Sequence, residues 1–425
     1  MTVEHVVLRR ATEAQFNQGV VNQLEQWGGG LSLPLFQQRE ELLKATGMGQ
    51  ELTGWVLLPS SAPADTLDFL CSVRTYRRPI YYLPGSSSAS PHPSAPSSTS
   101  AEPSAATSGT PTARRVTAYS VATVFTPAKN RGKGYAQKMM ELLHAELRTK
   151  GDGAELLQDD EEKDGKPLEA WKGGKDGLLS FLLSDVGHFY ARAKDERSGR
   201  GWRVQGTTTT TWNLAESLQT SPESFSTPPT PPSGFHTSPI TSTDLASVAL
   251  ADAALLHTSL SASVPSSKPR FIVEPTPSSF EWSTTRSTHA FAARGLPVPS
   301  LWGFQLRGEA EGGRAAEDGW SYILLVMDPK LKVAKLLRLR LASTSAKELV
   351  AGHASYLVRA AAELARSHGM EQMLGWNVPS AALEELEEGD KGVTAEREGN
   401  LSAVAWYGEG DGEVEWENNE SYTWC

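Results

Sequence analysis

The stretch VFTPAKNRGKGYAQKMM, Val124 to Met140, has the pattern of a strand, a glycine-containing loop and the start of a helix. Apolar side chains recur at every fourth position after the loop: Tyr135, Met139, Leu143 and Leu147. This spacing predicts an amphipathic helix whose first N–H groups lack partners within the helix. Gly132 and Gly134 would let backbone amides approach a phosphate, and Arg131 and Lys133 add positive charge. The stretch therefore predicts a pyrophosphate-binding turn.

Two other phosphate-binding motifs fit this loop poorly. A Walker A loop places Ser or Thr after Gly-Lys, but Gly134 and Tyr135 follow Lys133 here. A dinucleotide fingerprint needs a third glycine where Gln137 stands. The sequence excludes a P-loop and disfavours a dinucleotide site.

Around the loop, the predicted elements over residues 1–215 follow the order β-α-α-β-β-β-α-β-α-β. The segment VTAYSVATVF alternates with period two and predicts a strand buried on both faces. Residues 85–113, almost entirely Ser, Thr, Pro, Ala and Gly, are expected to form a disordered loop. Residues 158–176 have the composition of a charged surface insertion.

The pattern restarts in the second half of the chain. Residues 216–278 are expected to be a largely flexible linker, and residues 279–425 a second, C-terminal α/β domain. In that domain we predict a helix from Ala346 to Ser367 and a series of strands: FEWSTTRSTHAFAAR, SLWGFQL, WSYILLVMD, LKVAKLLRLRLA, EQMLGWNV and LSAVAWYGEG. The fourth of these could also be helical by periodicity alone. A short helix is expected from Ser380 to about Glu388.

Composition sets limits on function. The 425 residues carry a formal net charge of −10, which leaves no global basic field for nucleic acid or an anionic membrane. The longest apolar run, Tyr322 to Met327, is too short to span a bilayer. Cys71 and Cys425, the only cysteines, cannot form a four-ligand zinc site, so we expect no metal. With no targeting signal at the N-terminus, a cytoplasmic location is expected.

The loop resembles the coenzyme A loop of the Gcn5-related N-acetyltransferase (GNAT) superfamily, which reads Arg/Gln-x-x-Gly-x-Gly/Ala. Arg131, Gly134 and Ala136 fill its three specified positions. The resemblance implies a GNAT fold, a mixed central sheet with flanking helices, with acetyl-CoA as cosubstrate. It implies that the strand at Val124 and Thr126 pairs with the pantetheine arm. It also implies that the pyrophosphate is held by the backbone of Arg131, Gly132, Lys133, Gly134, Tyr135 and Ala136. The alternative is a structural strand-to-helix turn.

A second resemblance lies downstream, in SDVGHFYARAKDERSGRGWRV. It is similar to the FY…GW segment of the superfamily and implies that Tyr190 is the general acid that protonates the departing sulfur. The chain departs from the family by extra residues, Lys194 to Arg200, before the Gly-Trp pair. The alternative is that Tyr190 only fills core.

The sequence leaves the general base open. Many family members supply a glutamate on the strand before the loop, but VTAYSVATVF contains no carboxylate. A base acting through water, or a side chain from elsewhere, remains possible; the candidates are Asp68, Asp185, His188 and Glu281. Cys71 as a covalent nucleophile is disfavoured, because no histidine is near it in sequence.

Several patterns spread along the chain resemble the fungal lysine acetyltransferases of lysine catabolism: LSLPLFQQREELLKAT, FLCSVRTYRRP, LWGFQL and the terminal NESYTWC. That family implies acetyl transfer to the ε-amine of free L-lysine. A lysine site would need partners for the carboxylate and the α-ammonium, and the candidates are Arg74, Glu281 and Trp282. The alternatives are another small amine, a protein lysine, or a catalytically silent acetyl-CoA-binding interaction protein. A second CoA site is not expected, because LASTSAKEL replaces the loop motif before the helix at Ala346.

Overall fold

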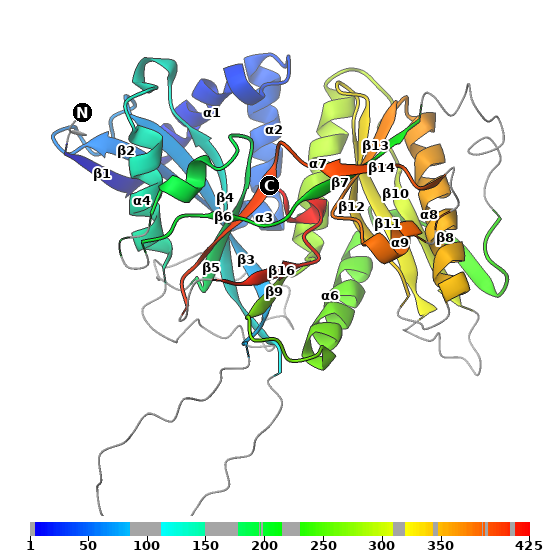
Figure 1. The fold of residues 1–425 in the computed structure, drawn as a ribbon. Coiled ribbons are helices and arrows are strands. Elements are labelled where there is room, and N and C mark those ends of the chain that lie inside the picture. Colours follow the sequence, from blue (N-terminus) through cyan, green and yellow to red (C-terminus); the bar gives the residue numbers. More distant parts are fainter. Residues whose placement is uncertain are drawn as a thin grey trace, which may run out of the picture.

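The computed structural model describes residues 5–85, 112–148, 177–194, 196, 199–214, 230–308, 319–342, 347–384, 386, 390–408 and 413–425. The loop expected over 85–113 and the charged insertion at 158–176 lie almost wholly outside the described residues. The chain forms two α/β units that stand side by side, as predicted, each built on a mixed sheet (Figure 1).

The first sheet has the strand order β1-β2-β3-β4-β5-β15-β6. All neighbours are antiparallel except β4 and β5, which are parallel. The strands are β1 (Val6–Arg10), β2 (Leu52–Pro59), β3 (Cys71–Leu83), β4 (Arg114–Phe125), β5 (Leu179–Ser184), β15 (Leu401–Trp406) and β6 (Arg203–Val204). Two short strands extend it beyond the end of β2: β9 (Arg270–Val273) pairs with β3, and β16 (Glu415–Glu417) pairs with β9.

The second sheet repeats this plan in the order β8-β10-β11-β12-β13-β7-β14. Its one parallel pair, β12 and β13, corresponds to β4 and β5. The strands are β8 (Phe235–Thr241), β10 (Leu301–Gly308), β11 (Ser321–Asp328), β12 (Val333–Arg340), β13 (Gln372–Trp376), β7 (Thr208–Asn213) and β14 (Val393–Glu396). LKVAKLLRLRLA, ambiguous in sequence, is therefore a strand.

The two units exchange a strand. β7 follows the first unit in sequence but lies between β13 and β14 of the second sheet. β15 follows the second unit but lies between β5 and β6 of the first sheet. In Figure 1, β7 (green) crosses to the second sheet and β15 (red-orange) crosses to the first. Each unit therefore completes the sheet of the other, so the predicted domains, residues 1–215 and 279–425, do not coincide with the two sheets.

The helices keep the same order in both units. In the first, α1 (Glu13–Trp27), α2 (Leu33–Ala45) and the short α3 (Gly47–Gln50) precede β2, and α4 (Tyr135–Leu147) links β4 to β5. In the second, α6 (Leu245–Ala262) and α7 (Pro277–Ala292) precede β10, α8 (Lys347–Ser367) links β12 to β13, and α9 (Ser380–Glu384) follows. Three 3-10 turns complete the list: η1 (Ala128–Asn130), η3 (Phe189–Arg192) and η7 (Ser421–Thr423).

Two sequence predictions are wrong. FEWSTTRSTHAFAAR is not a strand but most of α7: Thr276 accepts a hydrogen bond from the N–H of Ser279, and Pro277 stands at the first helical turn. These start signals outweigh its Ser and Thr content. The flexible linker predicted over 216–278 is also wrong from residue 235 onward: β8, α6 and β9 lie there, because an apolar helix face packs into the core.

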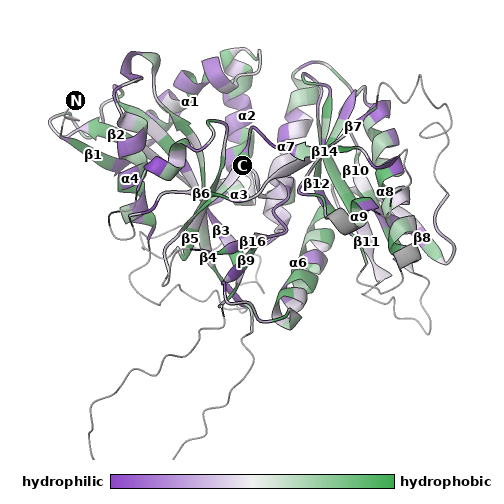
Figure 2. Ribbon diagram, in the orientation of Figure 1, coloured by the Kyte–Doolittle hydropathy of each residue, from purple (hydrophilic) through white to green (hydrophobic). Residues whose placement is uncertain are grey.

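Among the described helices, α6 is long and apolar enough to cross a membrane by length and composition alone. It packs against β3 and α7 in the structure, burying Leu245, Val248, Ala253 and Leu256. Its Asp252 is fully buried and forms an ion pair with Arg338 of β12 at 2.8 Å. The helix therefore serves as a core element that joins the two units. Figure 2 shows hydrophobic residues concentrated on the central strands of both sheets.

Candidate active site

The glycine loop has the geometry of an anion-binding turn. Gly132 and Gly134 have φ angles of 75° and 81°, in the left-handed region that favours glycine. Gly134 caps α4 without any side-chain hydrogen bond, and no protein atom lies within 4 Å of a Cβ built at either glycine. In the described part of the chain, the N–H groups from Gly132 to Ala136 have no acceptor. These amides are open for an external anion.

Arg131 braces the same turn. Its Nε donates to the carbonyl of Thr126 at 3.0 Å, and its guanidinium lies 5.8 Å from the ring centre of Phe125. The side chain is exposed and lines the neighbouring cavity. Arg131 thus fixes the end of β4 relative to the loop and leaves donors facing outward.

A Gly134→Val substitution should weaken acetyl-CoA binding about tenfold or more. A β-branched residue strains at positive φ by about 1–2 kcal/mol, and its side chain would enter the space that a phosphate needs. Isothermal titration calorimetry with acetyl-CoA measures this. Gly369→Val is the matched control, since Gly369 has φ 76° and an equally open Cβ position after α8. Unchanged affinity in Gly134→Val would refute the loop assignment.

Next to the loop, β4 and β5 separate. Their pairing ends at Val121 and Leu182, although β4 continues to Phe125. A bulge accompanies the separation. On the other side of β4, the register of the β3–β4 pair shifts between Ser72 and Arg74, and Thr123 has φ 56°. The backbone from Ala122 to Phe125 therefore has free hydrogen-bonding groups on the side facing β5. A cavity of about 470 Å³ opens there, lined by Val124, Thr126, Arg131, Leu183 and Tyr190.

Tyr190 lies across this opening from β4, on the 3-10 turn η3. Its carbonyl accepts hydrogen bonds from the N–H groups of Ala193 and Trp202, both at 3.2 Å. Trp202 is buried and donates from its indole to Ser180 on β5 at 3.0 Å. Burial, followed by Cys71 and Asp185, raises the pKa of Tyr190, so its phenol stays protonated at neutral pH. The FY…GW segment thus orients a neutral proton donor.

A buried charge cluster also lines the cavity. Glu40 of α2 accepts from Arg74 of β3 at 2.5 Å and from Arg39 at 2.8 Å. Burial alone would raise the pKa of Glu40, but Arg74 and Arg39 outweigh it and hold the pKa at about 2. Arg74 also donates to Gln23 at 3.0 Å. Arg74, a predicted substrate residue, therefore lines the cavity with its charge already matched.

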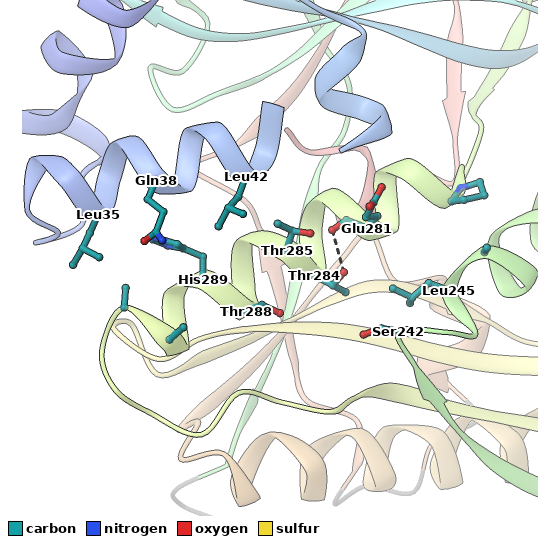
Figure 3. Close-up of a pocket in the computed structure, with 14 residues that line it drawn as sticks. Leu35, Gln38, Leu42, Ser242, Leu245, Glu281, Thr284, Thr285, Thr288 and His289 are labelled. Carbon is teal, nitrogen blue, oxygen red and sulfur yellow. Dashed lines mark hydrogen bonds between the residues drawn. The ribbon is translucent and has the colours of Figure 1, made fainter. Parts of the chain in front are cut away.

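Trp282 and Glu281, the other two predicted substrate residues, line different cavities. Trp282 lines the 470 Å³ cavity and packs against Trp424, with ring centres 5.6 Å apart. Glu281 is exposed and points into a different cavity between α2 and α7, where its carbonyl accepts from Thr284 at 3.1 Å (Figure 3). The cavity between α2 and α7 has no lining residue from the glycine loop or from η3.

The candidate bases also lie in different places. Asp68 is exposed and paired with Lys129 at 2.5 Å, and His188 is exposed outside the described cavities. Asp185 lines the 470 Å³ cavity and accepts from the N–H of Asn400 at 2.9 Å. Cys71 is buried, and desolvation raises its pKa to about 12, which keeps its thiol protonated. Asp185 is thus the sequence candidate that the structure brings to the site.

Among the cavity residues that sequence reasoning missed are Arg39, Glu40, Arg286 and Trp424. Glu40 had a local signal, because it falls on the apolar stripe of α2 between Phe36 and Leu43, where a carboxylate needs a buried partner. Arg286 lies on a segment that was predicted as a strand. Trp424 lies in the terminal NESYTWC pattern, but nothing in that pattern indicates that the C-terminal tail reaches the cavity.

Comparison with known proteins agrees with this architecture. Residues 217–425, just under half of the chain, match the family described as "LYC1 GNAT-like C-terminal domain". No curated protein matches the chain.

Solved structures resemble the chain weakly. A GCN5-related N-acetyltransferase from Anabaena variabilis has 11% identity and a TM-score of 0.47, over 95% of this chain and 73% of that one. N-myristoyltransferase of Saccharomyces cerevisiae has 10% identity and a TM-score of 0.47, over 98% and 82%. Eis1 from Mycobacterium abscessus has 9% identity and a TM-score of 0.44, over 95% and 73%. Likeness at this level carries no argument about activity.

The topology and the family match indicate the same fold. Both units have the helix and strand order expected of a GNAT fold, and the matched half is a GNAT-like domain. The chain thus has a two-unit architecture of the GNAT type. Its second half is similar to the LYC1 GNAT-like C-terminal domain.

Proposed function

We propose that the protein is an acetyl-CoA-dependent N-acetyltransferase that acetylates the ε-amine of free L-lysine. One observation carries the reaction type: Arg131 of the glycine loop, Val124 and Thr126 at the opening between β4 and β5, and Tyr190 line a single cavity. The free amides from Gly132 to Ala136 suit a pyrophosphate at one end of the donor. The end of β4 at Val124, beyond its pairing with β5, suits the amides of a pantetheine arm, and Thr126 follows directly.

In the proposed reaction, the neutral amine attacks the thioester carbonyl carbon directly. The tetrahedral intermediate collapses, the C–S bond breaks, and Tyr190 gives its proton to the departing sulfur. The amine loses its proton to water or to Asp185, the candidate base that lines the cavity. A covalent route through Cys71 is disfavoured, because a thiol with a pKa of about 12 supplies almost no thiolate at neutral pH.

Tyr190→Phe should lower kcat about 100-fold and change the Kd for acetyl-CoA less than twofold. The substitution removes only the hydroxyl that protonates the sulfur, while the ring contacts with Phe189 and Trp202 are kept. Stopped-flow thiol release and equilibrium titration separate the two quantities. Tyr356→Phe is the matched control, since that hydroxyl donates to Thr237 in the second unit. Equal turnover in Tyr190→Phe would remove its acid role.

The proposed acceptor is a small molecule because the cavity lies between the two units and is lined by Arg39, Glu40, Arg74, Trp282 and Trp424. Other small amines and protein lysines are the competing acceptors, and a silent acetyl-CoA-binding protein is the competing role. Tandem mass spectrometry of the product from acetyl-CoA and L-lysine tests the proposal. Acetylation on the ε-nitrogen is expected, and acetylation only on the α-nitrogen would contradict it. A cytoplasmic location stays a prediction from the sequence.

A further inference from the structure

Beside the 470 Å³ cavity lies another cavity of about 300 Å³, at the junction of the two units. Gln26, Trp27, Arg39, Arg286 and Trp424 line both cavities, so the two are adjacent. Arg286 therefore lies beside the cavity that Tyr190 lines.

The 300 Å³ cavity is strongly cationic. Among the described residues that line it are five cations and one carboxylate: Arg39, Arg286, Arg294, Lys330 and Lys335 against Asp328. The Oδ1 atom of Asp328 already accepts the N–H groups of Lys330 and Leu331, at 2.9 and 3.2 Å. The excess of positive charge is thus only partly balanced by the lining itself.

Two of these cations, Arg286 and Lys335, form cation–π contacts with indole rings. The guanidinium of Arg286 lies 4.8 Å from the ring centre of Trp424 and 5.8 Å from that of Trp282. The ammonium of Lys335 lies 5.4 Å from Trp424 and 5.6 Å from Trp376. Among the described residues, neither cation has a carboxylate within ion-pair distance. Cation–π contacts leave the N–H donors of both groups available.

The two cations also repel each other. Burial, followed by Arg39, lowers the pKa of Arg286 to about 10. Burial, followed by Arg286, lowers the pKa of Lys335. The acidic groups that face them, Glu40, Asp328 and Asp185, offset this only in part. Like charges kept together at a cavity wall favour the binding of an anion between them.

We propose that Arg286 and Lys335 form a subsite for the carboxylate of the acceptor, so that the substrate class is a free amino acid with a side-chain amine. This proposal rests on the proposed function. A carboxylate would receive charge-assisted hydrogen bonds from both cations, with the guanidinium offering a bidentate edge. A polyamine, which is wholly cationic, would be repelled from this wall.

Calorimetric binding of L-lysine and of L-lysinamide, in the presence of CoA, tests the subsite without requiring turnover. The two ligands differ in the carboxylate. The wild-type protein should bind L-lysine at least tenfold more tightly than L-lysinamide. Lys335→Met and Arg286→Met should each lose most of that preference by weakening L-lysine binding, with L-lysinamide binding unchanged. Since both variants remove a partly buried cation, we expect them to fold.

Lys332→Met is the matched control, because Lys332 makes the same charge change close by on an exposed ion pair with Glu371 at 2.5 Å. It should keep the full preference for L-lysine. Equal binding of the two ligands by the wild-type protein, no binding of L-lysine, or a preference that survives both cavity variants would overturn the subsite. A clear preference without any acetyl transfer would support the subsite and refute the proposed function, so the two failures are distinguishable.

Discussion

Replacement of Arg338 by methionine is expected to lower the free energy of unfolding by about 3–5 kcal/mol, the cost of leaving buried charges without a partner. Arg338 of β12 is buried between Asp252 of α6, at 2.8 Å, and Glu420, which it also contacts directly. Both carboxylates are buried, with 0% and 4% exposure. Its loss would leave them with weaker partners and would release the C-terminal tail that carries Trp424.

Urea unfolding at neutral pH measures the free energy of unfolding of the Arg338→Met variant. The Michaelis constant of this variant for the acceptor should also rise, because the tail carries Trp424. Arg203→Met is the matched control, since the Arg203–Glu413 ion pair, at 3.1 Å, is largely exposed and screened by solvent, so its loss should change the stability little. Similar stability of the Arg338→Met variant and the wild-type protein would show that the tail is not held by this cluster.

Glu40→Gln is expected to lower the free energy of unfolding by about 3 kcal/mol at pH 7. The folded-state pKa of Glu40, about 2, lies below the usual value of 4.5, so its contribution is fully present above about pH 4.5 and is lost as the pH falls through about 2. The stability difference between wild type and variant should therefore narrow to about half at pH 3.

Unfolding measured at pH 7 and pH 3 checks both the size and the sign of this effect. Glu41→Gln is the control, because Glu41 is the exposed neighbour on the same helix. A difference for Glu40→Gln that is small at pH 7, or that grows as the pH falls, would contradict the ionised Arg39–Glu40–Arg74 cluster.

The local parts of the fold could be predicted from the sequence. The strand before the glycine loop, the two glycines and α4 were predicted together, because positive φ and a four-residue apolar spacing are encoded within a few neighbouring residues. The strand β11 and the long helix α8 were also predicted from local patterns, whereas the pattern of β12 fitted a strand or a helix. Tyr190 was found through its segment, and the structure places it on the cavity.

The non-local parts could not be predicted. The exchange of β7 and β15 depends on pairing between residues far apart, for which a single strand pattern gives no partner. The cation–indole wall joins Arg286, Lys335, Trp376 and Trp424 from four separate segments. The sequence instead favoured Glu281, which is five residues before Arg286 but points into another cavity, since the two lie on different faces of α7.

The most direct test of the central claim is release of free CoA thiol from acetyl-CoA by the purified protein, with L-lysine compared against ornithine, spermidine and a histone-tail peptide. The account predicts saturable release that requires L-lysine and is much slower with the other amines. Binding of acetyl-CoA without thiol release in the presence of any of these amines would contradict it.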